Sequence, residues 1–185
     1  IRHVLPERGI DDLALSAETR RLVEGVRRTA LNYRTLTKPI RFINSSANRG
    51  YKILFSGPSF ASAMDSVEAI ARELDTGICM VPFNKLLLNN QDFEKGCNDL
   101  IKARALEISS IAHATGQLLV LVDREGNMGT FEQDDLRSAA QFLSHFMDYD
   151  GIMFMVSSAR NPKAILRKIF QYSLSFDVMS PSERL

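Results

Sequence analysis

Hydrophobic positions along this chain change their spacing near residue 50. Before that point, apolar residues recur at helical spacing and predict a helix over residues 16–33. After it, short apolar runs alternate with segments of helical periodicity, which is typical of strands followed by helices. The predicted strands are 51–56, 77–82, 117–123, 151–157 and 172–178, and the later predicted helices are 63–74, 92–114, 132–147 and 162–169.

Most of the predicted strands are apolar along their whole length instead of alternating. Uniformly apolar strands are buried on both faces, as in parallel sheets whose connections are helices. Strand–helix units in succession therefore predict an α/β fold in layers with right-handed crossovers. Residues 1–15 show no such period, so we expect an arm or linker there and one domain over residues 16–185.

Composition narrows the classes of function. Lys and Arg number 23 against 22 Asp and Glu, so the net charge of +1 argues against a broad nucleic-acid footprint. No apolar run is long enough to span a membrane. Two cysteines, Cys79 and Cys97, are too few for a disulfide framework or a metal site. We expect both side chains to be buried in the core of the protein and the protein to lie in a reducing intracellular compartment. Because the chain begins with Ile1, we expect a piece of a longer or processed protein.

The segment after the first apolar strand has the frame of a phosphate-binding loop. The strand runs into Gly57 and Pro58, and a working loop of the form G-x-x-x-x-G-K-[ST] would begin at that glycine. Counting from it, the second glycine falls on Ser62, the lysine on Ala63 and the Mg²⁺-binding hydroxyl on Met64. The residues that neutralise phosphate and hold the metal are therefore absent, and we expect no metal site here.

A second segment of the same kind lies at the end of strand 117–123. This apolar strand ends in Asp123, the place where an acid binds Mg²⁺ in phosphate-loop NTPases. The next position, which carries a catalytic Glu in those proteins, holds Arg124. Glu125 follows one residue later, where the side-chain direction along a strand is reversed. The sequence therefore predicts that the general base is missing.

A third buried strand leads into Arg160, Asn161 and Pro162, and a helix with Arg167 follows. In this order the segments resemble an AAA-family ATPase module. That family shows a G-P-P-G-T-G-K-T loop, a strand ending in D-E and a strand ending in A-T-N-R-P. The spacing is most similar to mitochondrial inner-membrane AAA proteins and FtsH-type AAA proteases.

The resemblance implies a three-layer P-loop NTPase fold with a five-stranded parallel sheet of strand order 5-1-4-3-2, flanked by helices. It covers residues 16–185 as the large α/β subdomain, without the helical lid that follows it in the family. It also implies assembly with other protein subunits, in rings.

Carried onto this sequence, the resemblance makes both nucleotide motifs degenerate. Phe60 and Ser62 take the inner glycine positions of the loop, where a bulky side chain resists the required backbone conformation. Arg160 takes the sensor Asn position, with Asn161 displaced by one residue. Arg167 matches an arginine finger given to a neighbouring subunit.

The expected function is therefore that of a catalytically inactive AAA-like domain, a pseudo-ATPase that is a structural or adaptor subunit of a larger assembly and not an enzyme. One alternative is a domain that still binds ATP or ADP without hydrolysis, or supports an active neighbour through Arg167. A second is an unrelated α/β enzyme acting near the carboxyl ends of the strands. Beyond a residual ATP or ADP we expect no cofactor. From the resemblance alone, we expect a location in mitochondria rather than in plastids.

Overall fold

The computed structural model describes residues 1–37, 50–83 and 97–178. The strands are β1 (Arg2–Val4), β2 (Tyr51–Ser56), β3 (Ile78–Pro82), β4 (Leu118–Asp123), β5 (Ile152–Ser157) and β6 (Tyr172–Ser175). The helices are the 3-10 helix η1 (Ile10–Asp12), α1 (Ala17–Thr37), α2 (Phe60–Glu73), α4 (Cys97–Thr115), α5 (Asn127–Thr130), α6 (Gln133–Ser144) and α7 (Ala164–Arg167).

One sheet joins all these strands, in the order β1-β3-β4-β5-β2-β6. The five predicted strands are parallel to one another and lie in the predicted order 5-1-4-3-2 when they are numbered along the chain. The expected count of five strands is wrong, because β1 adds a sixth, antiparallel strand at the β3 edge. A three-residue strand with a single apolar residue, Val4, has no hydrophobic period, so the pattern of residues 1–15 did not reveal it.

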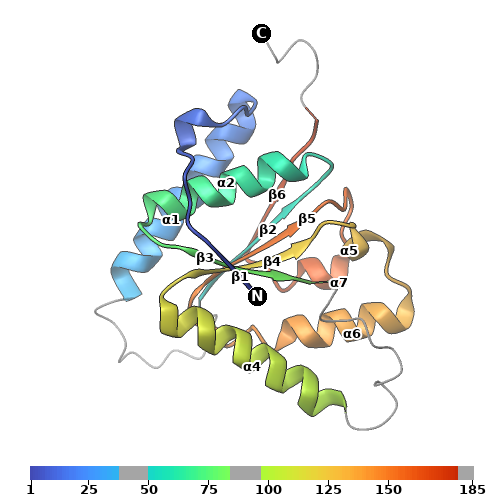
Figure 1. Cartoon of the computed structure of the whole chain (residues 1–185). Helices are drawn as coiled ribbons and strands as arrows, with labels where there is room; N and C mark the ends of the chain where they lie inside the picture. The colour runs from blue at the N-terminus through green and yellow to red at the C-terminus, as the bar shows by residue number, and fades with distance from the viewer. Residues whose placement is uncertain (38–49, 84–96, 179–185) are drawn as a thin grey trace.

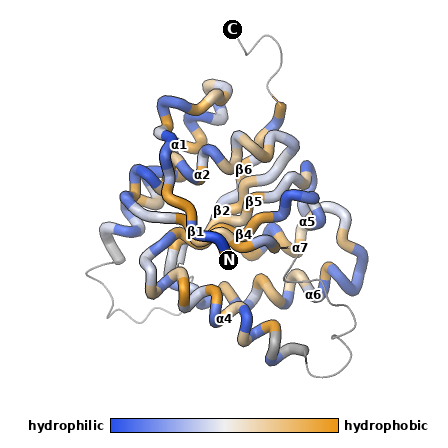
Figure 2. Tube along the Cα trace, in the orientation of Figure 1, coloured by the Kyte–Doolittle hydropathy of each residue, from blue (hydrophilic) through white to orange (hydrophobic). Residues whose placement is uncertain are grey.

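Helices cover both faces of the sheet (Figure 1), with α1 and α2 on one side and α4 and α6 on the other. Alternate residues of β2 point to different cores: Ile53 and Phe55 pack against α1 and α2, whereas Leu54 belongs to the core under α4 and α6. In Figure 2 the hydrophobic colour follows the central strands, while the helices alternate between the two colours. Burial on both faces explains why these strands are apolar throughout.

Lys52 and Cys79 are ionisable side chains enclosed within the strands. Lys52 in β2 is 2% exposed, and its Nζ donates to the carbonyl oxygen of Tyr149 at 3.2 Å. Burial lowers the pKa of this lysine. Cys79 in β3 is fully buried, as predicted, and burial raises the pKa of its thiol. The side chain of Cys97 lies outside the described residues.

The helices differ from the predicted bounds mainly near the strand ends. Helix α2 begins at Phe60, three residues before the predicted start, and α5 was not predicted. Helix α7 covers only Ala164–Arg167 of the predicted 162–169. The start of the predicted helix 92–114 lies outside the described residues. Among the described helices, none is both long and apolar enough to cross a membrane.

Candidate functional site

The carboxyl ends of four parallel strands meet in one row. Asp123 of β4 lies opposite Ser157 of β5, which lies opposite Ser56 of β2, and Ser56 lies opposite Ser175 of β6. The first three of these side chains are buried. The row brings Asp123 to the same edge of the sheet as the loop that follows β2.

The loop after β2 is closed by the chain that follows β6. Gly57 has φ +126°, and a Cβ built on it would lie 2.4 Å from the carbonyl oxygen of Phe176. That same oxygen accepts a hydrogen bond from the backbone N–H of Ser59 at 3.0 Å, and Ser157 O accepts one from Gly57 N at 3.0 Å. Pro58 has no N–H to offer. The amide groups of the loop are therefore bonded to neighbouring strand ends, and glycine is required by the close approach of Phe176.

Beyond Ser59, the chain is already helical. Phe60 and Ser62, which stand at the inner glycine positions, lie in the first turn of α2, and Ser62 Oγ is 2.8 Å from Ser59 Oγ. Ala63, at the lysine position, is fully buried in the core under α1 and α2, and Met64 is half-buried against the same core. Without inner glycines, nothing in this sequence interrupts the helix, so α2 extends three residues toward the strand.

Asp123 is fully buried, and its carboxylate accepts hydrogen bonds from three internal donors. Oδ1 accepts from the backbone N–H of Asn127 at 2.9 Å. Oδ2 accepts from the backbone N–H of Met128 at 3.0 Å and from Ser157 Oγ at 2.7 Å. The acid therefore caps the start of α5, after a turn in which Gly126 has φ +75°. The sequence signal for this role is the Gly126-Asn127 turn just after the strand.

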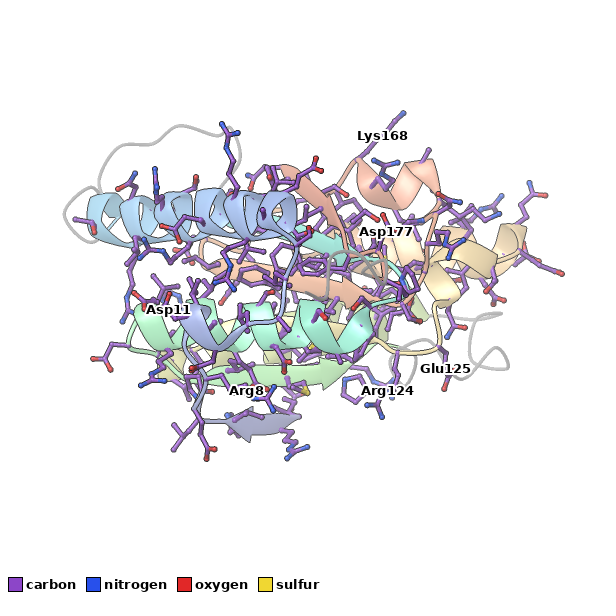
Figure 3. All side chains as sticks on the ribbon, turned by 90° about the horizontal axis from the view of Figure 1, so that it is seen from above. Arg8, Asp11, Arg124, Glu125, Lys168 and Asp177 are labelled. Atoms are coloured by element: carbon purple, nitrogen blue, oxygen red, sulfur yellow. The ribbon has the colours of Figure 1, made fainter. Side chains whose placement is uncertain are left out.

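Arg124 and Phe60 come from different elements and contact each other. The guanidinium carbon of Arg124 lies 5.7 Å from the centroid of the Phe60 ring, a cation–π arrangement. Glu125 is exposed, and its Oε2 accepts from Asn127 Nδ2 at 3.3 Å. Figure 3 shows Arg124 and Glu125 together beyond the end of β4. Arg124, at the expected Glu position, and Phe60, at an expected glycine position, are thus neighbours.

The structure leaves the predicted sensor and finger residues at the surface. Arg160, in the loop after β5, and Arg167, at the end of α7, are both exposed. Asn161 is exposed too, whereas Pro162 is buried. No hydrogen bond or ion pair joins Arg160 or Arg167 to Asp123 among the described residues. The roles that the resemblance implies for these two arginines remain predictions.

These contacts do not fit a site for magnesium and a triphosphate. The loop amides at Gly57 and Ser59 donate to carbonyl oxygens, and the carboxylate of Asp123 has three donors of its own. A hard cation needs free oxygen ligands, and three of the roughly four lone-pair positions of this carboxylate are already occupied. Within residues 1–37, 50–83 and 97–178, no group of three or more His, Cys, Asp or Glu side chains could hold a metal ion.

Comparisons with known proteins show which fold this chain has. No protein-family model matches this chain, and no curated protein matches it. Among solved structures it is similar to the crystal structure of the FIGL-1 AAA domain, and to that domain in complex with ADP. Each likeness has a TM-score of 0.58 at 14% identity and covers 97% of this chain, but only 58% and 59% of the matched chains. The likeness shows the α/β fold of AAA phosphate-loop NTPases, and the chain spans less than two thirds of the matched length.

Proposed function

We propose that this chain is a catalytically inactive AAA-type domain that serves as a structural or adaptor subunit of a larger protein assembly. The observation that carries the proposal is the buried carboxylate of Asp123, which accepts three internal hydrogen bonds. Asp123 stabilises the end of β4, because it accepts hydrogen bonds from Asn127 N, Met128 N and Ser157 Oγ. Releasing it for a metal would leave those three donors without an acceptor.

The chain lacks several residues that ATP binding and hydrolysis require, and the effects of these losses add to one another. The lysine of a working loop makes a charge-assisted contact with phosphate worth roughly 1.5–3 kcal/mol, and Ala63 supplies none. A missing general base and a missing metal ligand lower the rate of phosphoryl transfer by several orders of magnitude. Arg124, Ala63 and Met64 stand at these positions. The proposal therefore places the working part of the protein on its surface.

Other protein subunits are the proposed partners. The AAA fold is retained over 97% of the chain, which supports a role for its shape where its chemistry is lost. A mitochondrial location, ahead of a plastid one, remains part of the proposal on the resemblance alone.

The test is calorimetry of ATP and ADP binding to the purified chain with Mg²⁺ present, together with an assay of phosphate release. We expect no binding heat up to about millimolar nucleotide and no phosphate release. Micromolar binding, roughly −8 kcal/mol, that is lost in Asp123→Asn and depends on Mg²⁺ would contradict the proposal. The variant separates binding through the strand end from adventitious binding elsewhere.

A second candidate is nucleotide binding without hydrolysis. The start of α2 favours it, because Ser59 makes no side-chain cap hydrogen bond there and the first amides of a helix attract anions. The same calorimetry distinguishes the two functions: this candidate requires binding that persists without Mg²⁺ and without phosphate release.

A further inference from the structure

The charges of this chain are unevenly distributed. Positive and negative residues nearly cancel over the whole chain, but residues 151–176 contain no acid. The same stretch contains four cations: Arg160, Lys163, Arg167 and Lys168. The stretch is therefore strongly basic within an almost neutral protein.

The four cations surround α7 and are all exposed. Ile165, in the middle of them, is 51% exposed, although it is a large apolar side chain. We refer to Arg160, Lys163, Ile165, Arg167 and Lys168 as the basic α7 surface. In Figure 3, Lys168 extends from α7 away from the body of the protein.

None of the four cations has an ion pair or a side-chain hydrogen bond in the part of the chain that the structure describes. Several arginines of the N-terminal half behave differently. Arg8 lies 2.8 Å from Asp65, Arg27 pairs with Glu24, and Arg20 donates to two backbone carbonyls. Arg8, Arg20 and Arg27 thus have partners within the chain, whereas the four cations of the basic α7 surface have none among the described residues.

Local stability accounts for only some of these cations. Lys163 is the N-cap residue of α7, where the positive end of the helix dipole disfavours a cation. Arg167 is four residues further on, a spacing at which like charges on a helix repel each other. Arg167 and Lys168, however, lie at the end of α7, where the helix dipole favours a cation, so it is Lys163 that acts against the short helix.

The backbone of α7, which carries these charges, is nevertheless held firmly against the rest of the protein. Leu166 is fully buried and Phe170 nearly so, both in the core under α4 and α6. The backbone N–H of Lys163 donates to Met128 O at 2.9 Å, which ties α7 to the turn beyond Asp123. The exposed side chains therefore project from a fixed backbone, so a partner would not have to order it first.

We propose that the basic α7 surface docks an acidic segment of a partner protein, with Ile165 as its apolar anchor. An apolar centre within a charged rim is the usual layout of a protein–protein interface, and complementary charge guides its encounter. A nucleic acid fits less well, because its affinity rests on many phosphate contacts and the chain carries a net charge of +1. The docking deepens the proposed adaptor function but uses none of the residues of the loop after β2.

The experiment measures binding of three fluorescent synthetic peptides to the full chain by anisotropy. The first is a glutamate-rich peptide with a central leucine, the second replaces that leucine by alanine, and the third replaces the glutamates by lysines. A single-stranded oligonucleotide and vesicles of anionic phospholipid are titrated in parallel. We expect the first peptide to bind tightest, and its affinity to fall as salt is raised, since salt screens exposed charges.

Two triple variants make the test specific. Lys163→Glu, Arg167→Glu and Lys168→Glu together are expected to weaken the first peptide by about tenfold or more. The matched control, Arg21→Glu, Lys102→Glu and Arg104→Glu, makes the same change of net charge at exposed positions of α1 and α4 and should bind almost normally. Ile165→Ala should abolish the difference between the leucine and alanine peptides. Circular dichroism confirms that each variant is folded, and the corresponding glutamine substitutions serve if a reversed variant is not.

Equal weakening in both triple variants, or no binding of the first peptide, would overturn the proposal. Tighter binding of the oligonucleotide or the vesicles would overturn it in favour of those partners. Nucleotide calorimetry on the same preparation keeps the two proposals apart. A chain that binds neither peptide nor ATP retains the proposed loss of catalysis without this docking surface.

Discussion

The loop edge of the sheet, formed by Gly57, Ser59 and Asp123, and the basic α7 surface treat polar groups in opposite ways. At the loop edge, the amides of Gly57 and Ser59 and the carboxylate of Asp123 are all bonded inward. On the basic α7 surface, the charged groups point outward. The difference indicates that the polar groups at the loop edge stabilise the fold, whereas those around α7 are available to a partner. Substitutions at the loop edge should therefore reduce stability.

The largest effect is expected for Gly57→Ala. The new Cβ would lie 2.4 Å from Phe176 O, and φ +126° is strained for any other residue, so we expect a loss of about 2–4 kcal/mol in unfolding free energy. Urea unfolding followed by circular dichroism measures it. Gly116→Ala is the matched control, because its φ is +64° but nothing lies within 4 Å of the new Cβ. An equal loss in both variants would mean that the contact with Phe176 contributes nothing.

A smaller loss is expected for Asp123→Ala. The substitution leaves Asn127 N, Met128 N and Ser157 Oγ without their acceptor, at a cost of about 1–3 kcal/mol. The same urea titration, with and without Mg²⁺, measures it. Asp177→Ala, which removes an exposed acid, provides the control. A more stable Asp123→Ala chain would show that the carboxylate carries an unpaired charge awaiting a ligand, and the comparison would fail.

The smallest effect at the loop edge concerns Arg124 and Phe60. A cation–π contact at an exposed site is worth about 0.5–1 kcal/mol, so a double-mutant cycle of Arg124→Ala and Phe60→Leu should give a coupling free energy of that size. Thermal and urea unfolding of the four proteins measure it. Additive losses would place Arg124 with the outward-pointing cations instead of with the loop edge.

The sequence predicted the parallel strands well, because burial on both faces leaves a run of apolar residues such as those of β4 and β5. It missed β1, where backbone pairing with β3 and a contact of His3 Nδ1 with Gln117 Oε1 at 2.6 Å hold a strand with no hydrophobic period.

The finer geometry of the candidate site could not be predicted from the sequence. The donors to Asp123 include two backbone amides, and amides carry no residue-specific signal. Likewise, the approach of Phe176 to Gly57 joins residues far apart in the chain. The motif alignment identified the positions that matter, but only the packing shows what each residue does there.

Because Cys79 is buried, the rate at which its thiol reacts can report local opening of the protein around β3. Thiol reagents attack the thiolate, and this thiol is enclosed and has a raised pKa, so modification requires the strand to open first. In a chain with Cys97→Ser, the rate of maleimide labelling therefore records how often the core between β3 and the helices α4 and α6 opens. The thiol thus measures local unfolding on the face of the sheet that α4 and α6 cover.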